Sequence, residues 1–455
     1  MTYIDANPAQ YADGLKKGLS EDLIREISGD KNEPKWMLDH RLESFEIFKK
    51  KPLPSWGPDI SKLDLDDIIY YAHPGTEPAS EWEEVPEEIR RVYDRLGIPE
   101  AEQKYLAGAG AQYESEIVYH SLKQKWQELG VIFLDMDEAL KEHEELVKEY
   151  FMKCVPNTDH KFAALHGAIW SGGTFLYIPK GVEVVEPLQA YFRMNAMNMG
   201  QFEHTLIIVE ESANVHYIEG CSAPKYGTQA LHAGTVEIFA KPGSKVRYSS
   251  VENWSRDTYN LNTKRAFVER DATMEWVGGN MGSCNTMLYP CSMLTGEGAR
   301  CDHLGIAFAT EDQWQDTGAK VFHLAPNTSS KITSKSVSKD GGTCVYRGVL
   351  HIAPNAKGST SSIECDALLL DDKSRTDTVP DIKVRNNDVT IAHEASVGKL
   401  SEEDLFYFTS RGIEEDEAKA MIVNGFMDPI VRELPLEYAI EMNRLIELEM
   451  EGSVG

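Results

Sequence analysis

Hydrophobic residues recur at helical spacing near both ends of the chain and at strand-like spacing in its middle. Over residues 36–51 they fall on one face, which predicts an amphipathic helix that ends at Pro52. That face consists of Leu38, Leu42, Phe45 and Phe48. Residues 87–96 and 114–129 follow the same pattern and are also predicted to be helical, separated by the small-residue link 106–111. We therefore expect a helical N-terminal domain over residues 1–155.

Short runs of β-branched and aromatic residues dominate the chain from about His160 to Ala395. They recur at intervals of about ten to twelve residues and are bounded by Gly, Asn, Asp and Ser, which is typical of β-strands joined by turns. The clearest runs are residues 205–209, 235–239, 245–251, 273–277 and 343–352. A sandwich, a barrel and a parallel β-helix all produce this pattern. The spacing predicts a mainly β core over residues 156–398 and leaves these three architectures open.

Helical spacing returns after Leu400. Ser401 with Asp404 resembles a helix start, and the acidic run 414–417 would begin a second helix, favoured by the helix dipole. Pro435 would begin a last helix with an apolar stripe formed by Tyr438, Met442, Leu445 and Leu448. We expect a C-terminal helical domain over residues 399–455, whose stripe either packs in a core or docks a partner.

The charge balance narrows the classes of partner. The chain has 46 basic and 74 acidic residues, a formal net charge of −28, which argues against binding to nucleic acid or to an anionic membrane. It has no apolar core of signal-peptide type near its start and no run of membrane-spanning length. Its seven cysteines are odd in number and thinly spread, which favours a reducing compartment. We expect a cytoplasmic protein whose partners are other proteins.

Several motifs that would define an enzyme are absent. There is no Gly-x-x-x-x-Gly-Lys-[Ser/Thr] loop and no Gly-x-Ser-x-Gly elbow of a serine hydrolase. No Cys-x-x-Cys pair occurs, although Cys284, Cys291 and Cys301 are clustered, and this disfavours a structural zinc site. Any dependence on nucleotides is therefore expected to come from a partner.

Candidate chemistry is concentrated in residues 361–400. Cys365 lies at a strand-like position, and His393 with Glu394 follows in the same β-rich region. Thiolate, imidazole and carboxylate are side chains that iron accepts as ligands, and the thiolate is also a sulfur nucleophile. The alternative is a small buried cysteine and a His–Glu pair on the surface.

The same region carries several aspartates that suggest a competing function. Carboxylates on adjacent coils of a β-helix could serve as the acid and base of a polysaccharide hydrolase. These residues are Asp366, Asp371, Asp372, Asp377 and Asp381. The chain lacks a secretory signal and a run of aromatics typical of a sugar groove, which argues against this alternative. A purely structural β-helix is a third possibility.

Motifs along the whole chain resemble the SufB branch of the SufB/SufD family of iron–sulfur cluster assembly scaffolds. They include YFRMNAMNMGQFEHT (residues 191–205), YIEGCSAP (217–224), ECDALLL (364–370) and HEA (393–395). Further matching segments are residues 35–42, 96–119, 315–338, 346–348, 421–425, 433–437 and 452–455. SufD shares the architecture, but the long N-terminal helical zone, EGCSAP and HEA favour the SufB branch.

The resemblance implies a fold and a set of partners. It implies a right-handed parallel β-helix flanked by N- and C-terminal helical domains, dimerising edge to edge with SufD or with a second copy. The ATPase SufC would dock on the C-terminal helical domain, so ATP acts only through SufC. A cysteine desulfurase system would supply persulfide sulfur. The chain itself would be a scaffold for a transient iron–sulfur cluster rather than an enzyme, and a requirement for reduced flavin stays open.

The resemblance also implies roles for individual residues. Sulfur would enter at Cys221 in EGCSAP and pass inside the β-helix to the acceptor Cys365. The residues implied along this route are Arg193, Asn195, Glu252, Trp254 and Lys264. Relatives carry Gln where this chain has Glu252, which leaves the local charge of the route open. Cys365, His393 and Glu394 would hold iron of the nascent cluster at the dimer interface.

Elementary chemistry agrees with these roles. Sulfane sulfur moves when a thiolate attacks the outer sulfur of a persulfide, so each residue that receives sulfur needs an activated thiol. Cations such as Arg193 and Lys264 would favour thiolate and persulfide anions in a low-dielectric interior. Without the resemblance, the alternative is that these cations form salt bridges or lie on a solvated face.

Overall fold

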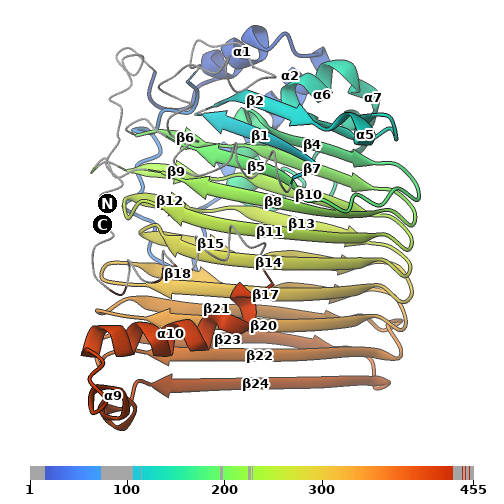
Figure 1. Cartoon of the computed structure of the whole chain (residues 1–455). Coiled ribbons are helices and arrows are strands. Elements are labelled where there is room, and N and C mark those ends of the chain that lie inside the picture. The colour runs from blue at the N-terminus through green and yellow to red at the C-terminus, as the bar shows by residue number, and fades with distance from the viewer. Residues whose placement is uncertain are drawn as a thin grey trace.

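The chain forms a parallel β-solenoid of about eight turns with helices at both ends (Figure 1). The computed structural model describes residues 16–72, 106–113, 115–194, 198–223, 227, 229–433, 443, 446 and 450. The prediction of a mainly β fold with a β-helix core is thus confirmed, and the sandwich and the barrel are excluded. No described helix is long and apolar enough to cross a membrane.

The longer strands stack into one sheet, which we name sheet 1. Over the described residues it has ten strands, parallel throughout except for the β1–β2 pair. In spatial order they are β2 (Glu116–Leu122), β1 (Gly108–Tyr113), β5 (Leu188–Arg193), β8 (Asn214–Ser222), β11 (Lys245–Trp254), β14 (Thr273–Gly282), β17 (Arg300–Ala309), β20 (Ser329–Ser338), β22 (Ser359–Leu369) and β24 (Val389–Lys399).

The remaining strands form sheet 2, which supplies the other sides of each turn. Its two arms meet at β21, whose first half pairs with β18 and whose second half pairs with β19. One arm contains β3 (Ile132–Asp135), β4 (Gly173–Ile178), β7 (His204–Val209), β10 (Thr235–Ala240), β13 (Thr263–Val268), β16 (Cys291–Leu294) and β19 (Lys320–His323). The other contains β6 (Gly200–Gln201), β9 (Ala230–His232), β12 (Thr258–Asn260), β15 (Asn285–Leu288) and β18 (Trp314–Thr317), and β23 (Arg375–Val384) pairs with β21 (Thr343–Ile352).

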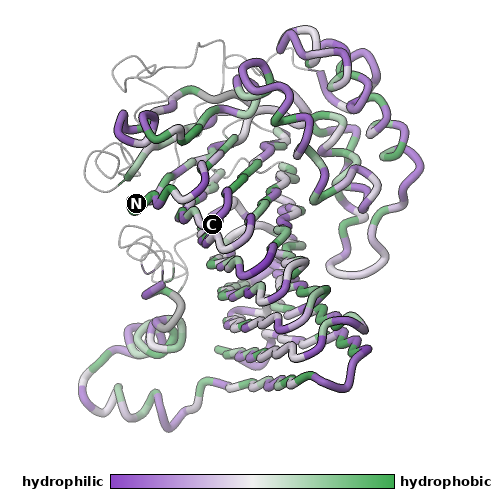
Figure 2. The backbone as a smooth tube through the Cα atoms, turned by 90° about the vertical axis from the view of Figure 1, so that its right-hand side faces the viewer, coloured by the Kyte–Doolittle hydropathy of each residue, from purple (hydrophilic) through white to green (hydrophobic). Residues whose placement is uncertain are grey.

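Parallel register decides which side chains share the interior, because side chains alternate between the two faces of a strand. In sheet 1, Tyr217, Tyr248 and Trp276 occupy the same register position on β8, β11 and β14. Their rings lie 5.6 and 5.2 Å apart and pack in the main core between the sheets. Figure 2 shows hydrophobic segments repeated from turn to turn along the stack.

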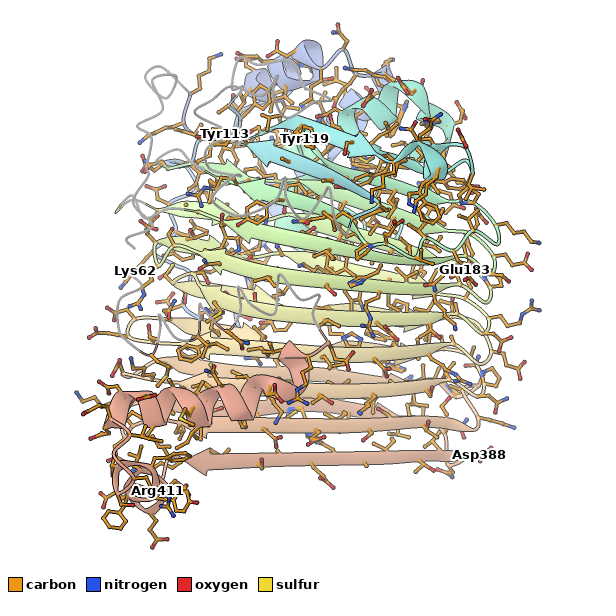
Figure 3. All side chains as sticks on the ribbon, in the orientation of Figure 1. Lys62, Tyr113, Tyr119, Glu183, Asp388 and Arg411 are labelled. Carbon is orange, nitrogen blue, oxygen red and sulfur yellow. The ribbon has the colours of Figure 1, made fainter. Side chains whose placement is uncertain are left out.

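Helices close the first turns and flank the last ones. Those near the N-terminal end are α1 (Glu21–Asp30), α2 (Lys35–Lys50), α5 (Gln124–Gln127), α6 (Met136–Glu142), α7 (Glu144–Tyr150) and α8 (Lys161–Ile169), and those after the solenoid are α9 (Glu402–Thr409) and α10 (Glu415–Val431). Val423 and Met427 of α10 pack on the outer face of sheet 1. Arg411, just after α9, lies beside the lowest turn, and Asp388 marks the start of β24 (Figure 3).

The predicted helices agree with the structure in part. The helix expected at residues 36–51 is α2, and those expected at Ser401 and at residues 414–417 are α9 and α10. The prediction for residues 114–129 is wrong, because this segment forms β2 and only the short α5, and the small-residue link 106–111 enters β1. A Cβ on Gly108 would lie 2.5 Å from Ser121 O, so the small residues permit this close strand pairing, which overrides helix propensity.

Other predictions fall partly outside the described residues. Residues 87–96 lie outside them, as does most of the helix expected from Pro435, of which Ile446 and Met450 are buried against the α10 cluster. Helix α8 lies inside the predicted β core and was missed, because every one of its residues except Lys161 is buried and no amphipathic period results. The domain limits at 155/156 and 398/399 stay predictions.

A buried ion pair ties α2 to α8. Arg41 donates from Nε and Nη2 to the Glu33 carboxylate at 2.8 and 2.5 Å, and both side chains are almost fully buried. Its guanidinium also donates to the carbonyls of Ala168 and Trp170 at the end of α8 and lies 4.8 Å from the Trp170 ring.

We expect Arg41→Ala to lower the free energy of unfolding by about 3–5 kcal/mol, because it leaves Glu33 buried without its counter-charge. Urea denaturation followed by circular dichroism measures this. Arg25→Ala is the matched control, since its pair with Glu21 is half exposed and should cost less than about 1 kcal/mol. Equal losses of unfolding free energy in the two variants would contradict a stabilising role of the buried Arg41–Glu33 ion pair.

Candidate functional site

An enclosed cluster of ionisable side chains surrounds Cys221. Cys221 and Glu219 lie two residues apart on β8, so both face the interior, and Glu252 on β11 is the register neighbour of Cys221. Lys264 reaches the same space from β13 of sheet 2. All four side chains, and Trp254 at the end of β11, are at most 2% exposed.

Lys264 is the central cation of this cluster. Its Nζ lies 2.7 Å from Glu252 Oε1 and 3.5 Å from Glu219 Oε1, and 5.0 Å from the centre of the Tyr248 ring. Burial would lower the pKa of Lys264, but the two carboxylates outweigh it and hold that pKa above its ordinary value. Burial would raise the pKa of Glu252, yet Lys264 and His232 keep it below the ordinary value.

A chain of hydrogen bonds continues from Glu252 on sheet 1 to Asn260 and His232 on sheet 2. Glu252 Oε2 accepts from Asn260 Nδ2 at 2.5 Å and from Trp254 Nε1 at 3.4 Å. Asn260 Oδ1 lies 3.0 Å from His232 Nδ1, and His232 Nε2 lies 2.5 Å from Glu203 Oε1. Glu252 is therefore partnered here by a cation and two donors.

Glu219 is the member best placed to exchange a proton with Cys221. The Cys221 Sγ lies 3.9 Å from Glu219 Oε1. Burial raises the pKa of Glu219, and Lys264 only partly offsets it. Burial, then Glu219 and Glu252, raise the pKa of Cys221 well above its ordinary value, with Lys264 opposing them. The resting cluster thus holds a protonated thiol beside a carboxyl group whose pKa is also raised by burial.

One of the predicted route residues, Arg193, does not join this cluster. Arg193 is in register with Ser222, one position past Cys221, so it lies on the other face of sheet 1, where its Nη1 donates to Ser222 Oγ at 2.8 Å. Asn195 lies outside the described residues. Lys264, Glu252 and Trp254 do meet at the enclosed cluster.

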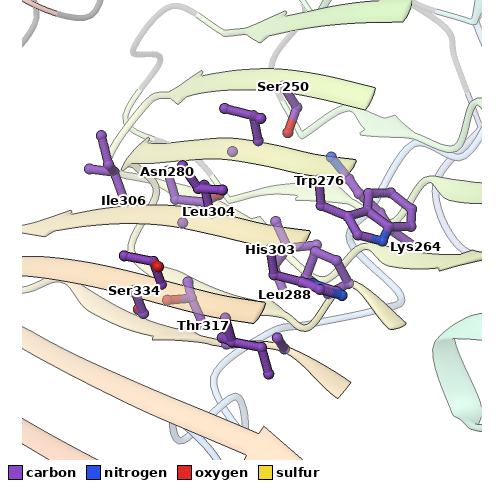
Figure 4. A pocket seen from close by; sticks show the side chains of 18 of the residues that line it. Ser250, Lys264, Trp276, Asn280, Leu288, His303, Leu304, Ile306, Thr317 and Ser334 are labelled. Atoms are coloured by element: carbon purple, nitrogen blue, oxygen red, sulfur yellow. The ribbon is translucent and has the colours of Figure 1, made fainter. Parts of the chain in front are cut away.

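A narrow internal cavity of about 50 Å³ lies between the cluster and Cys365, and neither Cys221 nor Cys365 is among its lining residues (Figure 4). Ser250 and Lys264 line one end, and Ser334 and Tyr346 line the other. One register column of sheet 1 follows its length: Glu219, Ser250, Gly278, Gly305, Ser334 and Cys365. A Cβ on Gly305 would meet no heavy atom within 4 Å, so the missing side chain leaves open space.

Cys365 ends this column near the last turn of the solenoid. Its side chain faces inward on β22 and is 5% exposed, with Ala395 of β24 as its register neighbour. His393, in register with Ile363, faces inward as well, and its Nε2 is buried without a hydrogen-bond partner among the described residues. Glu394, in register with Glu364, lies on the opposite face of the sheet.

Iron ligation by this chain alone is incomplete in the described residues. Over this part of the chain, no three His, Cys, Asp or Glu side chains are arranged to hold a metal ion. Cys365 and His393 share a face, whereas Glu394 does not. All seven cysteines are free thiols, and only Cys284 is more than slightly exposed.

The sequence did not identify Glu219, Glu203, His232 or Asn260 as site residues. Glu219 lies in the same motif as Cys221, but its partner Lys264 is 45 residues away, and His232 and Asn260 are 28 residues apart. Only the register of the turns brings these residues together. A search for polar residues repeated at the turn length would have found His232 and Asn260.

The fold is a β-solenoid that encloses a cluster of ionisable side chains, and comparison with known proteins shows the family. Residues 113–190 match the SufBD protein N-terminal region, and residues 192–426 match the SufBD core domain of SUF system FeS cluster assembly. An iron–sulfur cluster assembly SufBD family protein of Staphylococcus aureus is 57% identical over 440 residues, covering 97% of this chain and 95% of that protein. A SufBD family protein of Staphylococcus epidermidis is 56% identical with the same coverage. The chain therefore belongs to the SufBD family of iron–sulfur cluster assembly proteins.

The protonation of Cys365 gives a first test of the site. Burial raises the pKa of Cys365 to about 12, while the nearby Tyr346 hydroxyl opposes the shift. At pH 8 about one thiol in ten thousand would be ionised. We expect alkylation of Cys365 by iodoacetamide to accelerate about tenfold per pH unit from pH 7 to 9, as measured by mass spectrometry.

The matched variant is Tyr346→Phe. Loss of the hydroxyl should raise the pKa of Cys365 further and slow alkylation at every pH. A rate that levels off below pH 9 would mean an ordinary or lowered pKa and would contradict the burial of this thiol.

Proposed function

We propose that this chain is a scaffold that accepts persulfide sulfur at Cys221, delivers it through the solenoid to Cys365, and builds an iron–sulfur cluster there at a protomer interface. The observation that carries the proposal is the register column of small residues beside the internal cavity, which connects the Cys221 cluster to Cys365. Membership of the SufBD family supports the general function.

Sulfur uptake needs a thiolate at Cys221. The ionised form of Glu219, which Lys264 favours against burial, accepts the thiol proton, and the thiolate attacks the outer sulfur of a donor persulfide, such as that of a cysteine desulfurase system. The donor's S–S bond breaks, its thiolate leaves with the electron pair, and a new S–S bond forms on Cys221. Lys264 balances the resulting negative charge in an interior where charges interact strongly.

Delivery of sulfur to Cys365 must cover a distance that no single side chain can span. Five strand steps separate β8 from β22, or roughly 24 Å at the usual strand spacing. The intervening positions on the column carry Ser250, Gly278, Gly305 and Ser334, none of which is a thiol, and a Cβ on Gly305 would meet open space. The proposed carrier is hydrosulfide: it attacks the outer sulfur of the Cys221 persulfide, Cys221 leaves as the thiolate, and the Cys365 thiolate then attacks the resulting hydrogen disulfide and releases hydrosulfide.

The end of the solenoid supplies the place for a second protomer. β24 is the last strand of sheet 1 and β23 lies at the same end of sheet 2. Exposed apolar residues on these strands, including Val379, Ile382, Val384 and Val397, support pairing with SufD or a second copy. Cys365, His393 and Glu394 would then ligate iron, the substrate metal, and such a mixed set suits a cluster that must later be released.

The C-terminal helices are proposed to dock the ATPase SufC. Phe406 and Tyr407 of α9 are 71% and 55% exposed, and Met421 of α10 is 47% exposed. Aromatic and methionine side chains of this kind are enriched at protein interfaces. ATP would act only through SufC, in the cytoplasm, and the chain itself would catalyse no nucleotide chemistry.

The aspartates that suggested a polysaccharide hydrolase have ordinary structural partners. Asp366 accepts from Ser396 Oγ, and Asp371 accepts from backbone N–H groups of its own turn. Asp372, Asp377 and Asp381 form exposed ion pairs with Lys399, Arg375 and Lys383. This arrangement favours the scaffold over the carbohydrate enzyme.

Replacement of the acceptor tests the proposed function in cells. In a strain that depends on this chain, Cys365→Ala should abolish maturation of iron–sulfur enzymes, because no other inward thiol is in register with the column. Activity of a client enzyme in extracts measures this. Cys284→Ala, at a half-buried thiol away from the column, is the control. Undiminished maturation with Cys365→Ala would refute the assignment.

Obstruction of the cavity tests the route separately. Gly305→Val places a branched side chain in open space beside the column, so persulfide should still form on Cys221 while labelling of Cys365 falls to background. Persulfide tagging and mass spectrometry follow both sites, with Cys221→Ser abolishing label at both. Gly29→Val, on the exposed side of α1 where a Cβ also meets nothing, controls for general effects. Normal labelling of Cys365 in Gly305→Val would exclude this route.

A further inference from the structure

A second hollow lies on the outer face of sheet 2, away from the internal cavity. This cleft, which we name the outer cleft, has a volume of about 670 Å³. The segment 51–56 that follows α2 forms one wall, and β13, β16 and β19 form the floor. The volume lies in the range of small-molecule sites.

The outer cleft is lined mainly by positively charged side chains, although the chain as a whole is acidic. The chain carries a formal −28, yet the charged residues lining the cleft are Lys51, Lys161, Lys264, Arg265 and Lys320 against the single carboxylate of Asp159. A concentration of positive charge in an acidic protein points to an anionic ligand.

Three of these cations already have partners. Lys264 pairs with Glu252 on the inner side of the sheet. Arg265 Nη2 lies 2.5 Å from Asp159 Oδ2, and Lys161 donates to the carbonyls of Phe48 and Lys51 at 2.8 Å, closing the end of α2. Lys51 and Lys320 form no ion pair with any described residue, so the positive charge of the outer cleft belongs mainly to them.

Lys320 is the better defined of the two. It is in register with Cys291, and Cys291 with Arg265, so these three side chains form a row on the outer face. Burial raises the pKa of Cys291, so this thiol brings no negative charge to Lys320. The Lys320 ammonium instead lies 5.0 Å from the Tyr289 ring and 5.9 Å from the Trp56 ring. Burial lowers its pKa, which an added anion would reverse.

Trp56 provides a ring surface next to this cation. Its indole is 43% exposed, although it contacts Tyr289 at 5.4 Å between ring centres. The Arg347 guanidinium, held by Asp316, lies 5.2 Å from the indole and fixes it from another side. A tryptophan that is held in place and still exposed is suited to stacking with a planar ring.

We propose that the outer cleft binds a phosphate monoester that carries a planar ring, such as a mononucleotide. Lys320 and Lys51 pair with the phosphate, and the exposed face of Trp56 stacks on the ring. The site goes beyond the proposed sulfur route, because it lies on the outside of sheet 2.

Isothermal titration of the full-length chain with AMP, adenosine and inorganic phosphate tests the proposal. AMP should bind at least about tenfold more tightly than either part alone, and added salt should weaken it. Lys320→Gln should weaken AMP binding about tenfold or more, whereas Lys320→Arg keeps the charge and should retain most of it. Trp56→Ala should weaken AMP and leave phosphate unchanged.

The control is Lys180→Gln, at an exposed lysine that pairs with Glu211 outside the cleft. It should bind AMP like the parent chain, and circular dichroism should show all variants folded. Absence of AMP binding at millimolar concentration, or equal binding by the parent and Lys320→Gln, would overturn the site. Equal affinity for AMP and phosphate would overturn the role of Trp56. Neither result would affect the sulfur route, whose tests use different residues.

Discussion

The parallel in-register stacking of successive turns is the constraint on which the rest of this structure depends. Each inward position of one turn lies beside the same position of the next, so a polar or small residue creates a column rather than an isolated feature. A shift by one residue would move Cys221, Glu252 and Cys365 to the outer face together. The aromatic column from Tyr217 to Trp276 fixes this register by packing that only one alignment permits.

The same stacking explains how the solenoid tolerates ionised groups in its interior. An isolated buried carboxylate or ammonium would be prohibitive, but Glu252 and Lys264 are in contact, and Asn260 and Trp254 satisfy the remaining acceptor positions. Glu219 avoids the cost differently, because burial favours its neutral form. Replacing such a cluster with apolar residues often stabilises a protein, so the ion pairing here is weak evidence that the cluster serves stability.

Sequence reasoning succeeded where a feature is local and failed where it depends on the turns. The amphipathic stripe of α2 and the Ser401 cap of α9 are short-range patterns, and both helices were predicted. Cys221, Glu219 and Cys365 lie in recognisable motifs, but the pairing of Glu219 with Lys264 and the contacts of His232 do not follow from motifs, because these partners come from other turns. Residues 114–129 were misassigned because pairing with β1 outweighs their helical propensity. Arg193 was grouped with Cys221 by motif, yet strand alternation places the two on opposite faces.

The two ends of the solenoid differ in a way that separates the two halves of the proposed chemistry. Helices cover the first turns, so the Cys221 cluster lies in a dry, low-dielectric interior that strengthens the influence of Lys264 on a sulfur anion. The last turn ends in β24, where most side chains are exposed and the backbone has no further strand of this chain among the described residues. Iron arrives hydrated and needs ligands that can rearrange, which an edge provides and a packed core does not. A scaffold that takes up sulfur inside and meets iron at its edge keeps the two reactants apart until both reach Cys365.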